Sequence, residues 1–340
     1  MKRIIFFIIA FAVSCSTNPD KLFEDSVKKY ISGNKNARFD IEASLIKAVS
    51  TVNFDFSETE ISPSSGFIRS SSEVNFLFPE KFKIKIKDAS NYENFQTDLN
   101  KTHIVFILDG IIHLYKKNGN FVKDIAVTEK DSSIKIESVV FYQENLIYYA
   151  GGHLYIYSYP DNKNELLLAE KMNQQLKGLN RVTMRISDGK LFLSAGIGGS
   201  YNINIIDLGK RNFVIRNMPV SSSRIFTPAS SIKYIDGGSG QWKLMEMTFA
   251  DKKTKVLTEL KDVIDIELFE NCAVIEGKSS ISVFDYNKSM IVMPFDFELG
   301  GSSSGSLILI SKDRYYAVSA DKLLEKIKFL KQNAPDLFVK

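Results

Sequence analysis

The sequence predicts an all-β fold, a β-propeller of about six to seven four-stranded blades, with short N-terminal helices and one C-terminal helix. Three observations predict it. Apolar residues alternate with a period of two from about Ser72 to Ser319. Dipeptides that suit tight hairpin turns separate the short strands. A group of strands then recurs along the chain at an offset of about 40 residues, which is the length of a propeller blade.

The alternating region divides into strands at Gly, Asn, Asp and Lys residues. Aspartate or asparagine followed by glycine adopts the positive backbone angles of two-residue hairpins. We therefore expect turns at Asp109-Gly110, Asn118-Gly119, Asp188-Gly189 and Asp236-Gly237. The first expected strands are Ile104–Leu108, Ile111–Tyr115, Phe121–Val127, Glu137–Tyr142, Leu146–Tyr149, His153–Ser158 and Leu166–Glu170.

One strand pattern marks the repeat. The stretch Ile112-His113-Leu114-Tyr115 resembles Gly152-His153-Leu154-Tyr155 at an offset of 40, from 153 − 113. The roughly 250 residues of the strand region at about 42 per blade give six blades, or seven if Glu73–Lys87 belongs to a closing blade. A pair of β-sandwiches or an irregular β-solenoid is the alternative. The same position in later blades is expected at Tyr201–Asp207, Trp242–Phe249 and Ile281–Tyr286, each followed by a further strand such as Lys255–Leu260 or Met290–Pro294.

The N-terminus has the plan of a lipoprotein signal peptide. Lys2 and Arg3 precede the apolar run Ile4 to Val13, which is too short for a bilayer that needs about 20 residues. The following Ala12-Val13-Ser14-Cys15 resembles a lipobox, with alanine in place of the usual leucine. We expect cleavage in front of Cys15, a diacylglyceryl thioether on its thiol and acylation of the new N-terminus, because two or more chains anchor a protein stably. An ordinary secretory signal with a chance cysteine is the alternative.

Helical patterns flank the strand region. Asn18 can cap a helix that has Pro19 in its first turn, and a second helix is expected at roughly Phe39 to Val49, with a loop at Ser62 to Ser72. We expect all the helices to dock on the body, with a lipid or partner contact as the alternative. At the C-terminus, Asp321 can cap a helix whose apolar stripe, Leu323, Leu324, Ile327 and Leu330, lies opposite Lys322, Lys326 and Lys328.

These patterns divide the chain into four parts: a signal peptide over 1–14, a lipidated tether with helices over 15–60, a propeller over 61–320, and a helix with a tail over 321–340. Hydrophobic residues make up 44% and charged residues 25%, which is ordinary for a globular chain. The formal charge of +4 falls to about +2 without Lys2 and Arg3, so we expect no nucleic-acid partner. With Cys15 acylated, Cys272 stands alone, which excludes a disulfide framework and predicts an unpaired, buried thiol.

Motifs for catalysis are weak, and we expect no catalytic site and no cofactor. Gly301 to Gly305 matches G-x-S-x-G with Ser303 as nucleophile, but that motif acts on a strand-to-helix elbow, and here it joins β-strands. Gly196 to Gly199 lacks the third glycine of a dinucleotide loop and is expected to be a hairpin turn. His113 and His153, with Asp109 as third ligand, are the candidate metal ligands if both imidazoles reach the channel. The alternative is that each histidine begins a strand and contacts solvent or a neighbour.

In overall plan the chain resembles exported β-propeller lipoproteins, and the BamB-like accessory lipoprotein of the outer-membrane β-barrel assembly machine in particular. The shared features are the signal, the cysteine, a short tether and repeats of about 40 residues. The chain has one tryptophan, Trp242, and lacks the A-x-D-x-x-T-G-x-x-x-W blade motif of that family.

The resemblance implies a scaffold that binds a periplasmic partner through loops on one propeller face, and the only site residue that it carries over is Cys15. We expect a lipid-anchored protein of the outer membrane, on its periplasmic face or at the surface, with an envelope protein as partner. Two other classes stay open. One is a surface-exposed ligand-binding lipoprotein, and the other is a propeller hydrolase or lyase with a channel site near His113 and His153.

Overall fold

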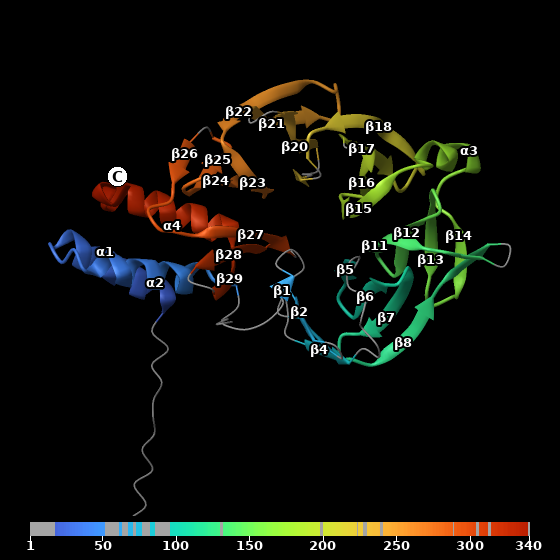
Figure 1. The fold of residues 1–340 in the computed structure, drawn as a ribbon, viewed down its shortest axis with the longest axis horizontal. Coiled ribbons are helices and arrows are strands. Elements are labelled where there is room, and N and C mark those ends of the chain that lie inside the picture. The colour runs from blue at the N-terminus through green and yellow to red at the C-terminus, as the bar shows by residue number, and fades with distance from the viewer. Residues whose placement is uncertain are drawn as a thin grey trace, which may run out of the picture.

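The computed structural model describes residues 18–51, 61–62, 67–70, 73–76, 82–85, 96–129, 132–197, 200–222, 224–226, 230–238, 241–287, 289–303, 306–311 and 314–338. Within these ranges, seven antiparallel sheets of three or four strands follow one another around a ring, and the helices of the two chain ends lie on one side of it (Figure 1). This arrangement is a β-propeller, as predicted. The count is seven because the segment Glu73–Lys87, expected to belong to a closing blade, contributes two strands to the first of these sheets, whose strands span Ile61–Lys85.

We number the sheets as blades 1 to 7 in chain order, and the first strand of each blade lies nearest the centre of the ring (Figure 1). Blade 1 holds β1 (Ile61–Ser62), β2 (Phe67–Ser70), β3 (Glu73–Phe76) and β4 (Phe82–Lys85). Blade 2 holds β5 (Gln96–Leu99), β6 (His103–Leu108), β7 (Ile111–Lys116) and β8 (Phe121–Ile125). Blade 3 holds β11 (Ile136–Tyr142), β12 (Asn145–Ala150), β13 (His153–Ser158) and β14 (Lys163–Leu166). The hairpin β9 (Val127–Glu129) and β10 (Ser132–Ile134) connects blades 2 and 3.

The later blades continue the same order. Blade 4 holds β15 (Asn180–Ser187), β16 (Lys190–Ile197), β17 (Ser200–Asp207) and β18 (Asn212–Val220), and blade 5 holds β19 (Ile225–Phe226), β20 (Ser231–Gly238), β21 (Gln241–Thr248) and β22 (Thr254–Lys261). Blade 6 holds β23 (Val263–Leu268), β24 (Cys272–Gly277), β25 (Ile281–Asp285) and β26 (Ser289–Val292). Blade 7 holds β27 (Glu298–Ser303), β28 (Ser306–Ser311) and β29 (Arg314–Val318).

The repeat predicted from the sequence corresponds to the third strand of consecutive blades. The five expected segments fall on β7, β13, β17, β21 and β25. The strands expected after two of them are the outermost strands β22 and β26. The alternating pattern therefore located the recurring strand in five consecutive blades.

The turn predictions hold where a two-residue loop closes a hairpin. Asp109 and Asp188 have φ of 53° and 47°, and the glycines that follow them are also positive. The prediction at Asp236-Gly237 is wrong, because both residues belong to β20 and pair with β21. Gly237 has φ +117°, and a Cβ there would lie 2.4 Å from the Gln241 carbonyl oxygen, so the glycine allows two strands to approach closely.

Three other predictions are corrected. The expected strand Leu166–Glu170 ends at Leu166, and Glu170 begins α3 (Glu170–Asn173), which η2 (Gln174–Leu176) continues. The expected loop from Ser62 to Ser72 contains β2. The expected strand Phe121–Val127 is divided between β8 and β9. In each case the boundary depends on which neighbouring strand supplies hydrogen-bond partners, which local sequence does not specify.

The core consists of apolar clusters that lie between adjacent blades. One cluster joins blades 2 and 3, a second joins blades 3 and 4, and further clusters join blades 4 to 5 and 5 to 6. Blades 3, 4 and 5 therefore bury both faces against their neighbours, which is why strands such as β12, with burial of Leu146 to Ala150, are apolar throughout.

Blade 7 receives its outer edge from the N-terminal part of the chain. Ser50 forms an antiparallel bridge with Val318 of β29. The Thr51 N–H donates to the Ala317 carbonyl at 2.9 Å, and the Ser319 N–H donates to the Val49 carbonyl at 2.9 Å. Residues that precede blade 1 thus pair with the last strand of blade 7, which ties the two ends of the strand region together.

Three helices cover the outside of blades 6 and 7 (Figure 1). α1 (Pro19–Ile31) is capped by Asn18, whose Oδ1 accepts from the Asp20 N–H at 3.0 Å, as predicted. α2 runs over Ala37–Val49 and α4 over Ala320–Asn333, followed by η3 (Pro335–Phe338). Ser319, not the predicted Asp321, caps α4 by accepting from the Lys322 N–H. No helix in the described ranges is long and apolar enough to span a bilayer.

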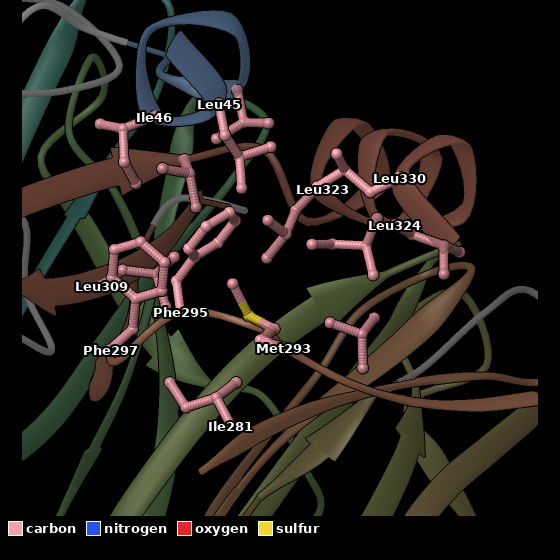
Figure 2. Packing of buried hydrophobic residues seen from close by; sticks show 14 of the residues in the cluster. Leu45, Ile46, Ile281, Met293, Phe295, Phe297, Leu309, Leu323, Leu324 and Leu330 are labelled. Atoms are coloured by element: carbon pink, nitrogen blue, oxygen red, sulfur yellow. The ribbon is translucent and has the colours of Figure 1, made fainter. Parts of the chain in front are cut away.

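The predicted docking of the helices on the body is confirmed. Figure 2 shows Leu45 and Ile46 of α2 and Leu323, Leu324 and Leu330 of α4 converging on side chains of blades 6 and 7. One correction concerns Lys326, which was expected opposite the apolar stripe. Its side chain is buried, and its Nζ lies 2.8 Å from Asp20 Oδ1 of α1, so it links the N- and C-terminal helices.

An ion pair between a buried carboxylate and a partly exposed lysine fixes α4 to blade 6. Lys328 of α4 donates to the carboxylate of Asp285 at the end of β25. Burial alone would raise the pKa of Asp285, but hydrogen bonds from Lys328 and from the Asn287 backbone N–H outweigh burial and hold this pKa below its usual value. The carboxylate therefore contributes to the stability of the folded state while it is ionised.

We predict that Asp285→Asn lowers the unfolding free energy by about 1.5–3 kcal/mol at neutral pH, the range for hydrogen bonds to a charged group. The folded-state pKa of Asp285 is below the unfolded value of 3.8, so its contribution is present above that pH and disappears as the pH falls through the folded value. Urea unfolding at neutral pH and below pH 4 measures this. A difference between wild type and variant that does not shrink in acid would contradict the prediction.

Candidate functional site

The predicted lipidation residue, Cys15, lies outside the described residues, which begin at Asn18. Two residues, Ser16 and Thr17, separate it from that point. Lipidation of Cys15 therefore stays a prediction. The structure shows only that α1 begins four residues after it, at Pro19.

The two candidate metal-binding histidines lie on third strands and contact different acids. His113 of β7 places Nδ1 2.6 Å from Asp124 Oδ1 and stacks on the Phe106 ring. His153 of β13 places Nε2 3.1 Å from Glu170 Oε1. Among the described residues, no three His, Cys, Asp or Glu side chains form a metal-binding group.

The expectation that these two histidines occupy equivalent blade positions is wrong. His153 directly follows its turn, because it pairs with Ala150 across Gly151-Gly152. The residue that pairs across the corresponding turn Asp109-Gly110 is Ile111, and His113 lies two residues further along β7. The equivalent turns of blades 2 and 3 are 42 residues apart, from 152 − 110, whereas the similar segments around His113 and His153 are 40 residues apart.

The two glycine motifs lie in hairpins, as expected. Ile197 of β16 pairs with Ser200 of β17, so Gly196 to Gly199 joins antiparallel strands. Ser303 ends β27 and pairs with Ser306 of β28, so G-x-S-x-G here lacks the strand-to-helix elbow.

The strongest candidate for binding is a groove of about 600 Å³ along the outermost strand of blade 4. Seven consecutive residues of β18, Phe213 to Pro219, line it, which makes the strand its floor. Met172 and Gln175 contribute one wall, and Met247 and Lys252 contribute the other. The groove therefore collects side chains from the segment after blade 3, from blade 4 and from blade 5.

Buried hydrogen bonds fix the wall formed by α3 and η2. Asn173 is buried, and its Oδ1 accepts from the Leu154 N–H at 2.9 Å while its Nδ2 donates to the Leu168 carbonyl at 2.8 Å. The Tyr149 hydroxyl donates to the Leu176 carbonyl at 2.7 Å. These bonds attach the short helical segment to blade 3, so the groove is formed before any ligand arrives.

The floor strand is irregular, which limits strand addition at its edge. The pairing of β18 with β17 shifts register twice. Asn217 has φ of 49°, and its N–H donates to Asn204 Oδ1 at 3.0 Å instead of to the strand backbone. Pro219 has no N–H to offer. Bulges and proline are devices that discourage edge-to-edge pairing, so binding here would depend on side chains more than on a continuous ladder.

The chemistry of the groove is apolar with a basic rim. Three methionines, Met172, Met218 and Met247, line it, and flexible thioethers adapt to irregular apolar ligands. Arg216 and Lys252 supply positive charge, and no acidic residue belongs to the lining. The Arg216 Nη1 donates to Gln175 Oε1 at 2.6 Å, which holds the guanidinium at the rim. The arrangement suits a chain segment that carries apolar and acidic side chains.

A second polar feature surrounds the centre of the ring, where side chains of inner strands bond to the next blade. Asp98 of β5 accepts from the Phe141 N–H at 2.6 Å. Arg185 of β15 donates to the Ile225 carbonyl at 3.3 Å. We call these contacts, together with those between blades 5 and 7 described next, the polar belt. Asp98 and Arg185 each occupy the third residue pair from the first turn of their blade, so these two contacts lie at the same height.

The charged part of the belt joins blades 5, 6 and 7. Arg224 Nη1 lies 2.7 Å from Glu267 Oε1, and its Nη2 lies 3.4 Å from Asp265 Oδ2. The Ser302 hydroxyl donates to Glu267 Oε2 at 2.5 Å. Glu267 is 2% exposed, and burial raises its pKa against the opposing influence of Arg224 and Ser302. The belt therefore contains one buried carboxyl group, that of Glu267, whose charged form is stabilised by Arg224 and Ser302.

Two other groups lie at different depths. Arg185 is exposed to solvent although its side chain bonds to the next blade. Cys272 is a free, fully buried thiol among the described residues, as predicted. Burial raises the pKa of Cys272 to about 12, so the thiol stays protonated and unreactive at neutral pH.

Comparison with known proteins gives no family assignment. No family model matches the chain, and no curated protein matches it. PorZ, a surface component of the type-IX secretion system of Porphyromonas gingivalis, is 13% identical with a TM-score of 0.46, over 66% of this chain and 31% of PorZ. The extracellular domain of BT4673 from B. thetaiotaomicron is 9% identical with a TM-score of 0.48, over 75% of this chain and 39% of that one.

A further likeness is to the Dos1 propeller, at 11% identity and a TM-score of 0.49, over 75% of this chain and 74% of that one. The chain spans about a third of the length of PorZ and of the BT4673 domain. At these scores the likenesses carry no argument about function, and the propeller assignment rests on the sheets themselves.

We predict that Arg224→Met lowers the unfolding free energy by about 2–3 kcal/mol, because it leaves the Glu267 carboxylate buried without its cation. The value is below the range for fully buried pairs because Arg224 is partly exposed. Adding Glu267→Gln should restore most of the loss. Urea unfolding of both single variants and the double variant measures the coupling.

The matched control is the exposed pair Lys278 and Asp262, whose Nζ and Oδ1 lie 2.9 Å apart. Lys278→Met with Asp262→Asn should show no measurable coupling. Equal coupling energies in the two cycles would contradict a special role for the polar belt.

Proposed function

We propose that the protein is a lipid-anchored lipoprotein of the cell envelope that holds a partner protein in the groove along β18. The observation that carries the proposal is the groove itself, because it is preformed, joins three structural units and presents an apolar floor with basic residues at its rim. A segment of a partner that carries apolar and acidic side chains complements such a surface.

The proposed anchor is compatible with this role. Acyl chains on Cys15 would hold the protein at a membrane through α1, which packs on blades 6 and 7. The groove belongs to blade 4 and lies on the other side of the ring from these helices (Figure 1). Anchoring and partner binding would therefore use different parts of the molecule. A role in outer-membrane protein assembly is the finer form of this proposal.

The anchor is tested at Cys15. We predict that Cys15→Ala abolishes incorporation of labelled palmitate and releases the processed protein from the membrane fraction. Cys272→Ala is the matched control and should retain the label, because its thiol is buried against the body. Labelling that survives Cys15→Ala and disappears in Cys272→Ala would refute the anchor.

The groove is tested by co-purification from detergent extracts of cells that produce the tagged protein. We predict that Met218→Ser together with Met172→Ser reduces recovery of the bound envelope protein at least about tenfold, as expected when two apolar contacts at the centre of an interface are lost. The control is Met290→Ser on β26, an outermost strand of blade 6 that does not line the groove.

Equal recovery with groove and control variants would exclude the groove as the binding surface. Recovery of a barrel-assembly component that depends on Met218 and Met172 would support the role in outer-membrane assembly. Groove-dependent recovery of other envelope proteins alone would count against that finer role and still support the scaffold.

A further inference from the structure

The hairpin formed by α1 and α2 has an outward face that is not covered by the body. Phe39 is 70% exposed and Ile31 is 53% exposed, although the opposite sides of both helices pack into the core. Both residues flank the loop at Ser32 to Asn36, so they lie at the same end of the hairpin. Large exposed apolar side chains at one place on a folded surface indicate a contact that the isolated chain does not satisfy.

Basic residues surround these apolar side chains. Residues 28–40 contain Lys28, Lys29, Lys35 and Arg38 against Asp40, which gives 4 − 1 = +3, whereas the whole hairpin 19–49 has six basic and five acidic residues, which gives 6 − 5 = +1. Arg38 donates to the Pro294 carbonyl at 2.8 Å and so contacts the body. Two of these cations have acidic neighbours, since Lys28 Nζ lies 3.6 Å from Asp25 and Lys35 Nζ lies 2.6 Å from Asp336.

Other lysines of the hairpin are unpaired. Within the described residues, Lys21, Lys29 and Lys47 make no ion pair. Lys21, Lys28 and Ile31 follow one exposed stripe of α1, which also carries the exposed Glu24, and Phe39 and Lys47 follow one exposed stripe of α2. The outward face therefore combines exposed apolar side chains near the loop with unpaired lysines along both helices.

The chain that precedes α1 determines how far this face can lie from a membrane. Cys15 is three residues before Asn18, so about 11 Å of extended chain at most joins the two. α1 has 13 residues and is about 20 Å long. A lipid on Cys15 would therefore hold the start of α1 within reach of the lipid headgroups, and the other end of the hairpin would be one helix length away.

We propose that the outward face of the α1–α2 hairpin lies on an anionic bilayer surface, with Phe39 and Ile31 entering the interface and the lysines contacting lipid phosphates. Exposed aromatic and aliphatic side chains combined with basic residues are the features of helices that bind at such interfaces. The proposal rests on the proposed lipid anchor for the proximity of the membrane. It adds a second attachment point, which fixes the orientation of the propeller.

The experiment uses the mature chain with Cys15→Ser, which cannot be acylated. We predict that it sediments with vesicles of equal parts phosphatidylcholine and phosphatidylglycerol, less at high salt, and little with phosphatidylcholine alone. Phe39→Ser with Ile31→Ser should weaken binding about tenfold. Val256→Ser with Val292→Ser removes comparably exposed residues, 49% and 45%, from outer strands β22 and β26, and should leave binding unchanged.

No sedimentation with anionic vesicles, or an equal loss in the two double variants, would overturn the proposal. So would concentration-dependent dimerisation that Phe39→Ser with Ile31→Ser abolishes, since a second copy would then cover the face. The failure of the proposed lipid anchor can be distinguished from the failure of this proposal. Absence of palmitate on Cys15 in cells would refute the anchor, whereas vesicle binding is measured on the unacylated chain and does not depend on that result. Thermal unfolding followed by circular dichroism verifies that each variant is folded.

Discussion

The pairing of Val49–Thr51 with β29 is the constraint on which the rest of the structure depends. A ring of sheets that pack only on their neighbours is held by the contact between its first and last members. Here the chain passes the outer edge of blade 7 before it begins blade 1, so hydrogen bonds between residues about 266 apart in sequence join the two ends. Since blade 7 has three strands of its own, the same segment also covers an edge that would otherwise be open.

That closure explains why both termini are helical and why they lie together. The segment that pairs with β29 is the continuation of α2, and α4 begins directly after β29, so α2 ends and α4 begins at the seam. Lys326 of α4 then reaches Asp20 of α1, and Lys328 reaches Asp285 of blade 6. The helices therefore reinforce the position at which the ring closes, and their apolar stripes complete the core of blades 6 and 7.

Features set by local sequence could be predicted, and features set by distant contacts could not. The alternating pattern located the third strands, and Asn18 with Pro19 located the start of α1, because each depends on a few neighbouring residues. Asp236-Gly237 was misread because its positive φ serves a close approach between strands instead of a turn. The equivalence of His113 and His153 failed because side-chain similarity was preferred to the register of the turns.

The groove and the polar belt had no readable signal in the sequence. Met172, Met218 and Met247 are separated by tens of residues, and each is an ordinary apolar residue in its own element. Arg224 and Glu267 belong to different blades, so nothing in the chain indicates that they meet. The signal that could have suggested the belt is weaker: Glu267 interrupts the mostly apolar strand Val263–Leu268, and a charge in such a strand requires a partner.

The separation between the helices and the groove gives the proposed function its physical logic. A membrane contact through one point would leave the propeller free to rotate about its tether, whereas two contacts along a hairpin about 20 Å long restrict that rotation. The helices cover blades 6 and 7, and the groove lies on blade 4, across the ring (Figure 1). Because the interblade clusters and the polar belt make the ring stiff, an orientation imposed at the helices also determines where the groove points. A partner segment with acidic and apolar side chains would then meet a surface held at a defined place relative to the membrane.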